Sequence, residues 1–300
     1  MGVIRVGISG WTYRSWRGDF YPAGLAQRLE LTYAAERMSS VEINGSFYSL
    51  QRPSSYERWR DATPPGFVFA VKGGRYITHL KRLSGVETPL ANFFASGPLM
   101  LGEKLGPILW QLPATVAFDA PLLEGFFDLL PRSTVAAAAV ASHHDDKVPE
   151  GRASTTAPTD QPLRHALEVR YDSFREEKAA QLLQRHDISL VLADSAGRWP
   201  MIERRTSDFT YVRLHGHTKL YTSGYAPANL DRWAERCLTW ADEGQDVYVY
   251  FDNDVLGHAP HDALALESRA TSRRAPGPSP APGPSPAEPS MARRRVGHHG

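Results

Sequence analysis

Eight short apolar runs recur along the chain, and each one ends in a polar or charged residue. Most of the gaps between them are long enough to hold a helix. Alternating strands and helices of this kind predict a single eight-stranded β/α barrel of the TIM type, in which active sites lie at the carboxyl ends of the strands. The runs are Val3–Ser9, Val41–Asn44, Phe67–Lys72, Ile108–Gln111, Ala166–Arg170, Ile188–Asp194, Tyr211–His215 and Val247–Asp252.

The alternation within each run predicts which side chains face the barrel interior. In the fifth run, Leu167 and Val169 share one face, and Glu168 and Arg170 share the other. Charged residues are costly to bury against helices, so we place them in the interior, near the mouth. The same rule predicts one polar ring at the mouth, made of Glu42, Asn44, Lys72, Gln111, Glu168, Arg170, Asp194, Arg213, His215 and Asp252.

The mixed charges of this ring leave more than one role open. A buried polar network can serve only to fill the top of a barrel, but a site is the usual reason to keep so many ionisable groups. A metal site at Glu168, Asp194 and His215 is disfavoured, because no His-x-x-x-His or Glu-x-x-His spacing accompanies them. The cofactor therefore stays unknown, and the candidate catalytic residues are Glu42, Lys72, Glu168, Asp194 and His215.

Basic and aromatic residues near the mouth indicate ligand binding. Arginines bind phosphate or carboxylate in bidentate fashion, and the loops after the last two strands of such barrels commonly hold phosphate. Aromatic side chains in the predicted loops offer stacking surfaces for a base or a sugar. The candidate ligand-binding residues are Trp11, Asn44, Gln111, Arg170, Arg213, Tyr225 and Asn253.

Composition narrows the class of protein. Of the 300 residues, 42% are hydrophobic, which is enough for a large core, and the net charge of +1 gives no general attraction for polyanions. The one cysteine, Cys237, suits a reducing compartment. No apolar run reaches the ~20 residues of a membrane span, so we expect a cytoplasmic protein without membrane contact. Residues 1–269 are the predicted barrel, and the Pro-rich segment 270–300 is a predicted disordered tail.

Seven segments of the chain, taken in order, resemble the domain of unknown function 72 family, also called YecE-like. They are GISGWTYRSWRGDFYP, SVEINGSFYSL, FVFAVKGGRYITH, LGPILWQLP, HALEVRYDSF, YVRLHGHTKLYTSGY and VYVYFDND. The resemblance implies one β/α barrel and no established activity for the family in general. It covers the candidate residues Trp11, Tyr13, Glu42, Asn44, Phe47, Tyr48, Lys72, Thr78, His79, Gln111, Glu168, Arg170, Asp194, Arg213, His215, Gly216, Tyr225 and Asn253.

The chain departs from this family where its eighth run ends. The family usually has Phe-Asn-Asn there, whereas this chain has Phe251-Asp252-Asn253. The Asn-Ala that follows in the family is replaced by Asp262-Ala263. Both changes exchange an amide for an acid, which weakens an anion site at this point or favours a cation.

Two functions follow from these features, and a third stays open. The first is an enzyme, a hydrolase or an isomerase, that acts on a phosphate-containing or sugar-like small molecule at the mouth. The alternative is a non-catalytic protein that binds a nucleotide or single-stranded nucleic acid. The third is a scaffold without catalysis. The nucleic-acid-binding alternative rests on the aromatic residues of the loops and on scattered basic residues, which are Arg14, Arg17, Arg52, Arg58 and Arg75.

Overall fold

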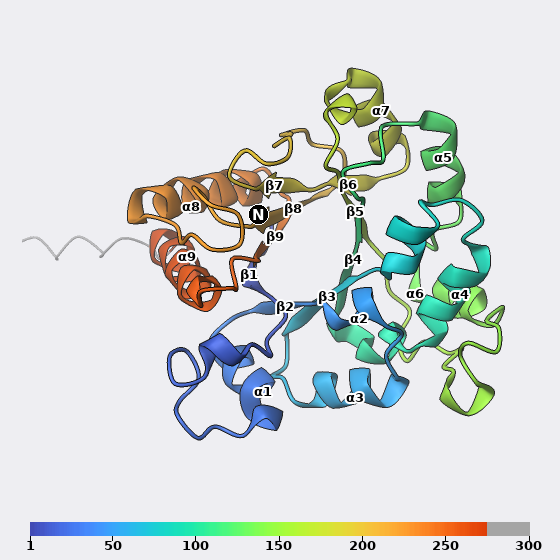
Figure 1. The fold of residues 1–300 in the computed structure, drawn as a ribbon, viewed down its shortest axis with the longest axis horizontal. Helices are drawn as coiled ribbons and strands as arrows, with labels where there is room; N and C mark the ends of the chain where they lie inside the picture. The colour runs from blue at the N-terminus through green and yellow to red at the C-terminus, as the bar shows by residue number, and fades with distance from the viewer. Residues whose placement is uncertain (275–300) are drawn as a thin grey trace, which may run out of the picture.

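The computed structural model describes residues 1–274, with strands at the centre of the molecule and helices around them (Figure 1). Every strand pairing is parallel. The strands are β1 (Ile4–Ser9), β2 (Ser40–Ile43), β3 (Val68–Lys72), β4 (Leu105–Gln111), β5 (His165–Glu168), β6 (Ile188–Leu190), β7 (Leu192–Asp194), β8 (Phe209–Leu214) and β9 (Asp246–Phe251).

The sheet closes on itself through the sixth apolar run. The strand order is β6-β5-β4-β3-β2-β1-β9-β8-β7, so β6 and β7 stand at the two ends of the order. They are halves of one run and are separated only by Val191. Because β6 pairs with β5 and β7 pairs with β8, this run bridges the two ends. The nine segments therefore make an eight-run barrel, which confirms the predicted fold.

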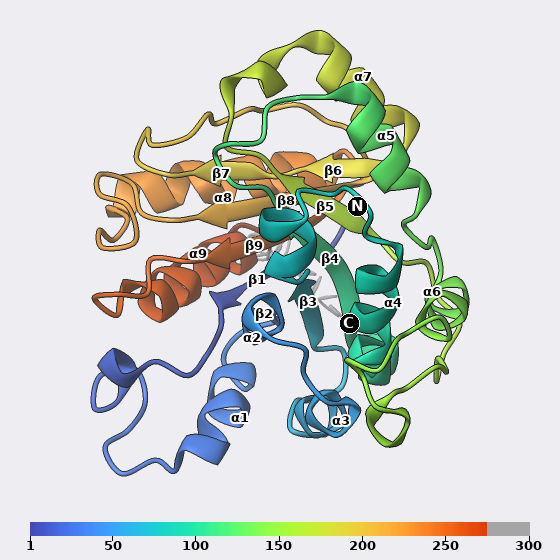
Figure 2. The same ribbon diagram turned by 45° about the vertical axis from the view of Figure 1, so that its right-hand side comes forward.

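Helices cover the outside of the barrel and fill most of the crossovers (Figures 1 and 2). Among them, α3 begins at Pro53, where the missing N–H of proline costs nothing. The helices are α1 (Glu30–Ala35), α2 (Gly45–Tyr48), α3 (Pro53–Asp61), α4 (Glu87–Ala95), α5 (Ala120–Asp128), α6 (Thr134–Ala141), α7 (Glu177–Arg185), α8 (Pro227–Asp242) and α9 (His258–Arg274), with short 3₁₀ or π turns at Arg14–Trp16, Gln27–Leu29, Tyr76–Leu80, Pro98–Lys104, Glu150–Arg152 and Asp172–Arg175.

Two apolar layers confirm the inside–outside alternation. A large outer cluster lies between strands and helices and includes Leu167 and Val169 of the fifth run. A smaller inner cluster fills the barrel below its mouth: Val68, Ala70, Leu109, Ala166, Val191, Ala193, Phe209, Tyr211, Tyr248 and Tyr250. Side chains two residues further along these strands point to the same interior, at its carboxyl end.

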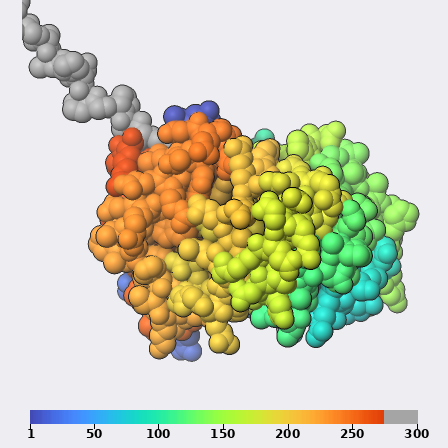
Figure 3. Space-filling view, turned by 90° about the horizontal axis from the view of Figure 1, so that it is seen from above, coloured from blue at the N-terminus to red at the C-terminus, as the bar shows by residue number. Residues whose placement is uncertain are grey.

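Two features depart from the sequence-based expectations. The connection between β7 and β8 holds no helix; in Figure 3 these residues, in yellow, lie beside the orange of α8. The predicted tail begins at 270, yet α9 continues to Arg274 because Arg269 and Arg273 both pair with Asp231 of α8, at 3.1 Å. The rest of that segment, 275–300, lies outside the described residues. Within 1–274, no helix is long and apolar enough to cross a bilayer.

Candidate functional site

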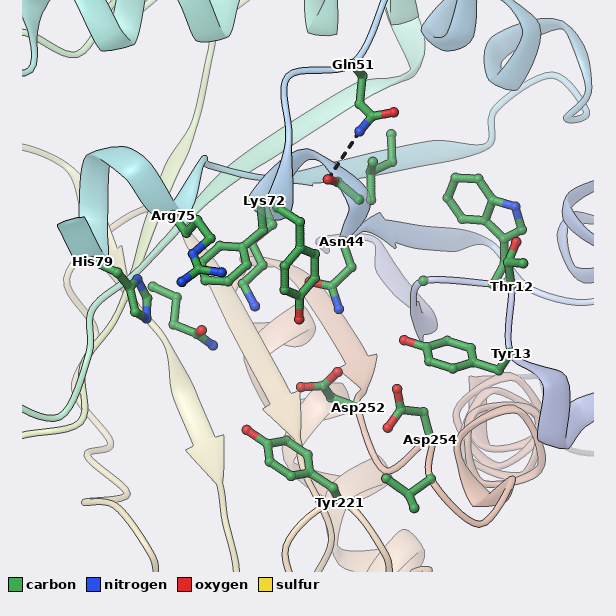
Figure 4. A pocket seen from close by; sticks show the side chains of 18 of the residues that line it. Thr12, Tyr13, Asn44, Gln51, Lys72, Arg75, His79, Tyr221, Asp252 and Asp254 are labelled. Carbon is green, nitrogen blue, oxygen red and sulfur yellow. Dashed lines mark hydrogen bonds between the residues drawn. The ribbon is translucent and has the colours of Figure 1, made fainter. Parts of the chain in front are cut away.

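A cavity of about 710 Å³ opens at the carboxyl ends of the strands (Figure 4). Its walls come from the strand ends and the segments that follow β1, β2, β3, β5, β8 and β9, and from one residue of α3. Glycines recur where these segments begin, and Gly73 shows why: a Cβ there would come within 2.3 Å of the Trp110 ring. The lining includes Gly10, Trp11, Thr12, Tyr13, Ile43, Asn44, Gly45, Phe47, Tyr48, Gln51, Trp59, Lys72, Arg75, His79, Gln111, Arg170, Tyr221, Asp252, Asp254 and Val255.

Below the cavity, Arg213 of β8 joins the carboxylates of three strands. Its Nε and Nη2 donate to Glu42 at 3.1 and 2.8 Å, and its Nη1 donates to Glu168 at 2.8 Å. Its Nη2 also lies 3.0 Å from the Ser9 hydroxyl and 3.1 Å from Asp252. The guanidinium is fully buried and its donors are occupied, so Arg213 does not bind a ligand. It holds together the floor of the cavity, which is the polar network of Glu42, Gln111, Glu168, Arg170, Arg213, His215 and Asp252.

His215 lies between two of these carboxylates. Its Nδ1 is 2.9 Å from Asp252 and its Nε2 is 3.5 Å from Glu168. Burial alone would lower the pKa of His215, but the hydrogen bonds to the two carboxylates raise it. Burial would likewise raise the pKa of Asp252 and of Glu168, but the Arg213 charge holds both well below their ordinary range. The two carboxylates therefore favour the protonated form of His215.

Arg170 and Gln111 complete the floor on the β4–β5 side. Arg170 donates to Glu168 through Nε and Nη2 at 3.2 and 3.1 Å, and its guanidinium lies over the Trp199 ring, 3.6 Å from the centroid. The Gln111 amide donates to Glu168 at 2.9 Å. Both residues line the cavity, so each can bind a ligand through the donor or acceptor atoms that are not bonded to Glu168.

The charges of the floor balance without Lys72. Glu42, Glu168 and Asp252 contribute three negative charges, and Arg213 and Arg170 contribute two positive charges. The protonated form of His215, which the carboxylates favour, supplies the third. Any further cation that faces the cavity is therefore surplus, and an anionic or electron-rich ligand group would offset it.

Lys72 is one such cation, and it lies deepest in the cavity wall. It is the last residue of β3, and its side chain is only 5% exposed. The Ser46 hydroxyl fixes its backbone by donating to the Lys72 carbonyl at 2.7 Å. Within residues 1–274 its Nζ makes no hydrogen bond or ion pair, and its contact is the Phe47 ring, 4.3 Å from the centroid. Burial, followed by the Arg213 charge, lowers the pKa of Lys72 to about 8.

Asn44 adds a second polar group without a partner. It follows β2 directly and lines the cavity, and its buried Oδ1 accepts no hydrogen bond from any described residue. A buried acceptor of this kind costs about 1–3 kcal/mol when it is left unpaired. An unpartnered acceptor and an unpartnered donor thus line the same cavity.

Aromatic rings form much of the wall around these two groups. Trp11 meets Trp59 edge to face at 5.3 Å, and Phe47 meets Tyr48 in the same way at 5.1 Å. Tyr48 is 67% exposed, so part of its ring is open to solvent. Amphipathic rings beside polar groups suit a sugar or another flat polar ligand.

An acidic wall faces Lys72 across the cavity (Figure 4). Asp252 ends the eighth run, and Asp254 lies two residues further on. Burial and the charge of Asp252 raise the pKa of Asp254. Tyr13 closes this wall and donates its hydroxyl to the Ser9 carbonyl at 2.7 Å. A carboxyl whose proton is held more tightly than usual is suited to proton transfer.

Three sequence-predicted residues do not join the site. In the sixth run Leu190 and Leu192 belong to the outer cluster, and Val191 and Ala193 belong to the inner one, so the alternation continues without a break. Asp194 therefore falls on the outer face, with its Oδ2 3.3 Å from His217, which corrects its predicted place in the interior ring.

Tyr225 and Asn253 lie behind the wall rather than on it. The Tyr225 hydroxyl accepts from the Gly216 N–H at 3.2 Å, and the Asn253 amide donates to Asp262 at 2.8 Å. Both residues are buried and tie the segment after β8 to α9. Loop residues of this kind have no period from which their direction can be predicted.

Of the remaining predicted residues, Trp11, Asn44, Lys72, Gln111 and Arg170 line the cavity. Glu42, Glu168, Arg213 and His215 lie beneath it in the buried network. In residues 1–274 no group of three or more His, Cys, Asp and Glu side chains is arranged to hold a metal ion. Because Asp194 lies apart from Glu168 and His215, these three residues do not form the metal site that their sequence positions left open.

Sequence reasoning missed Trp59, Gln51 and Asp254. Asp254 carried a usable signal, because it lies two residues after Asp252 in the last strand's extension. Trp59 lies on α3 and reaches the cavity from the outer layer, so no strand pattern points to it.

Comparisons with known proteins bear on the family and on the fold. A family profile described as "Protein of unknown function DUF72" matches residues 5–287. The chain is 25% identical over 289 residues to the UPF0759 protein YunF of Bacillus subtilis (strain 168), which covers 86% of this chain and 91% of YunF. It is 29% identical over 133 residues to the UPF0759 protein YecE of Escherichia coli (strain K12), which covers 43% of this chain and 45% of YecE.

Solved structures show the same barrel. A DUF72 family protein from Enterococcus faecalis V583 aligns with a TM-score of 0.69 at 18% identity, over 90% of this chain and 96% of that one. A DUF72 family protein from Thermotoga maritima MSB8 aligns with a TM-score of 0.66 at 23% identity, over 89% and 98%. At these identities the likeness shows the fold alone. The family resemblance and the fold are thereby confirmed, and the reaction has to be argued from the cavity.

Proposed function

This chain belongs to the DUF72 family of proteins of unknown function, and we propose that it is an enzyme of the isomerase type. Its substrate would be a small, sugar-like molecule that carries a phosphate and a carbonyl group. The observation that carries this proposal is the buried Lys72 ammonium, which faces a 710 Å³ cavity and has no hydrogen-bond or ion-pair partner within residues 1–274.

The cavity offers a complementary group for each part of such a substrate. Lys72 meets the carbonyl oxygen as a charge-assisted donor, and the vacant Oδ1 of Asn44 accepts from a neighbouring hydroxyl. Arg75 on the rim makes no ion pair within the described chain and is placed to take the phosphate. The Trp11 and Tyr48 rings provide faces for the carbon skeleton.

Asp254 is the proposed proton-transfer group. An isomerase removes a proton from the carbon next to a carbonyl and returns it to a neighbouring atom. The raised pKa of Asp254 moves its titration toward neutrality, where a carboxylate is a more effective base. Glu42, Glu168 and His215 act through the floor, by holding Arg213 and Asp252 in place.

The phosphate part is tested by calorimetric titration of inorganic phosphate into the full chain. Arg75→Ala should weaken binding about tenfold, the value of one lost charge-assisted contact. Lys81→Ala is the matched control, because Lys81 is an exposed cation on the same connection that does not line the cavity. Equal affinity in wild type and Arg75→Ala would remove the phosphate assignment.

The reaction is tested by proton NMR of short aldose and ketose phosphates in D₂O. Wild type should exchange the proton next to the carbonyl for deuterium. Asp254→Asn keeps the shape of the side chain and should slow that exchange at least about 100-fold, the usual contribution of a general base. No exchange with any sugar phosphate, despite phosphate binding, would favour a binding protein over an enzyme.

The nucleic-acid alternative rests on the same aromatic rings and on Arg75. A strand that spans several phosphates would bind with an affinity that falls steeply as salt rises. With a net charge of +1 and acids on one wall of the cavity, we expect no such binding of an oligothymidylate. Tight, salt-sensitive binding that Arg75→Ala weakens would replace the enzyme proposal with this one.

A further inference from the structure

We propose that Lys72 is a covalent catalyst that condenses with the substrate carbonyl to form a Schiff base. This inference rests on the proposed function, since it requires a substrate with an aldehyde or ketone group in the cavity. The inference goes beyond the proposed function, in which Lys72 only donates a hydrogen bond to the carbonyl oxygen and forms no covalent bond.

The surroundings of Lys72 differ from those of the other buried lysine. The chain has six lysines, at 72, 81, 104, 147, 178 and 219. Lys104 is also buried, but its Nζ donates to the Arg60 carbonyl, the Thr63 carbonyl and the Thr63 hydroxyl at 2.6, 2.7 and 3.1 Å. Lys72 has no such acceptor among the described residues and faces the cavity instead. Its nitrogen is therefore free to attack.

An amine must be neutral to act as a nucleophile. Burial and the nearby Arg213 charge destabilise the ammonium form and lower the pKa of Lys72 to about 8. At pH ~7 a lysine with that value is neutral about 200 times more often than an exposed lysine with a pKa near 10.4. The Phe47 ring beside Nζ offers no hydrogen-bond acceptor that would hold the amine, and both residues line the cavity from which a substrate would approach.

The condensation balances without an oxidant or a reductant. The lone pair of Nζ forms a bond to the carbonyl carbon, and the carbonyl oxygen takes up a proton as its π bond breaks. The nitrogen then loses a proton, the oxygen gains a second one, and the C–O bond breaks. One water leaves, and a C=N bond remains. Asp254, on the opposite wall, is the acid that can supply the proton to the departing oxygen.

Three carboxylates offset part of the cost of the charge on the product. A protonated Schiff base carries the positive charge that the Lys72 ammonium carried. Glu42, Glu168 and Asp252 favour a positive charge at this position, since each raises the pKa of Lys72 against the larger effect of burial. A charged imine withdraws electrons from the neighbouring carbon and makes its proton easier to remove, which is the step proposed for Asp254.

The experiment is reductive trapping on the full wild-type chain. Glyceraldehyde 3-phosphate is the probe, and sodium borohydride reduces any imine to a stable amine. Peptide mass mapping then locates the label. Lys72 should carry at least about ten times more label than any other lysine, because its neutral fraction is larger. Lys104 is the control within the same chain: its amine is also buried, but it is hydrogen-bonded and does not face the cavity, so it should carry little label.

A variant separates this inference from the proposed function. Lys72→Arg keeps the positive charge but cannot form an imine, so it should lose the label at this position and still bind inorganic phosphate. If Lys72→Arg does not fold, the wild-type map alone decides. Phosphate binding and deuterium exchange without preferential labelling of Lys72 would overturn the Schiff base and leave the enzyme standing. If wild type shows no phosphate binding, no deuterium exchange and no preferential labelling of Lys72, both the Schiff base and the isomerase proposal are overturned.

Discussion

Arg213 is the residue on which the floor of the cavity depends. It is wholly buried, and it pairs with carboxylates from β2, β5 and the end of β9. Charges at this depth are stable only when they are paired, so the arginine and its partners form one unit. The floor is best described as a fixed support for the groups above it.

Removal of this arginine should destabilise the whole protein. We expect Arg213→Met to lower the free energy of unfolding by about 3–5 kcal/mol, because it leaves buried carboxylates without a partner. Arg185→Met, which removes an exposed arginine 3.6 Å from Glu124, should change it by less than about 0.5 kcal/mol. Urea denaturation measures both. A small effect at Arg213 would show that the floor can reorganise.

His215 should make part of the stability depend on pH. Its pKa is raised in the folded protein, so protonation favours the folded state. This stabilisation is complete below the ordinary histidine value of ~6.5 and is lost as the pH rises through the raised value. The difference in unfolding free energy between wild type and His215→Asn should therefore shrink as the pH rises. His143→Asn, at an exposed position, is the control, and a difference that grows with pH would contradict the assignment.

At the scale of the element, the end of β3 determines where Lys72 points. Gly73 follows it and donates its N–H to the Leu109 carbonyl at 2.8 Å. Its missing Cβ leaves room for the Trp110 ring of β4. The strand end and its neighbour are packed too closely for any larger residue, which fixes the backbone from which the lysine extends.

Substitution of the two successive glycines should separate packing from flexibility. In Gly73→Ala the new Cβ would lie 2.3 Å from two carbons of Trp110, whereas in Gly74→Ala the nearest atom is 3.8 Å away. We expect Gly73→Ala to lower the free energy of unfolding by about 1–3 kcal/mol through overpacking. Gly74→Ala should stay within about 0.5 kcal/mol of wild type. Equal losses would point to backbone flexibility as the cause.

The strands and most of the cavity floor could be predicted from the sequence, because a buried parallel strand repeats every two residues. That rule placed Lys72, Gln111 and Glu168 correctly. The interior position predicted for Asp194 was wrong, because alternation through the sixth run puts Ala193 in the interior and Asp194 on the outer face. It could not address Tyr225, whose position depends on contacts between distant loops, and it gave no means of finding Trp59 on an outer helix.

At the scale of the whole molecule, one continuous core joins the first strand to the last helix. Trp16, Trp110 and Trp233 come from the beginning, the middle and the end of the described chain, and all three belong to the outer cluster. Strand β1 pairs with both β2 and β9, so the ends of the barrel depend on each other.

This continuity predicts cooperative unfolding. Tryptophan fluorescence, which reports side-chain packing, and far-ultraviolet circular dichroism, which reports secondary structure, should give the same urea midpoint. Two separate midpoints would show that part of the barrel unfolds on its own. Each signal is recorded on the same sample, so concentration and buffer cannot produce a difference.

The balanced floor has a consequence for how such a barrel diversifies. The charges of the floor are paired with one another and not with rim residues, so side chains at the rim can be replaced without leaving a buried charge unpaired. Mutagenesis confined to rim residues outside the core, such as the exposed Tyr48, should therefore yield catalysts with altered selectivity and unchanged melting temperatures. The barrel would then be a scaffold for evolving new specificities.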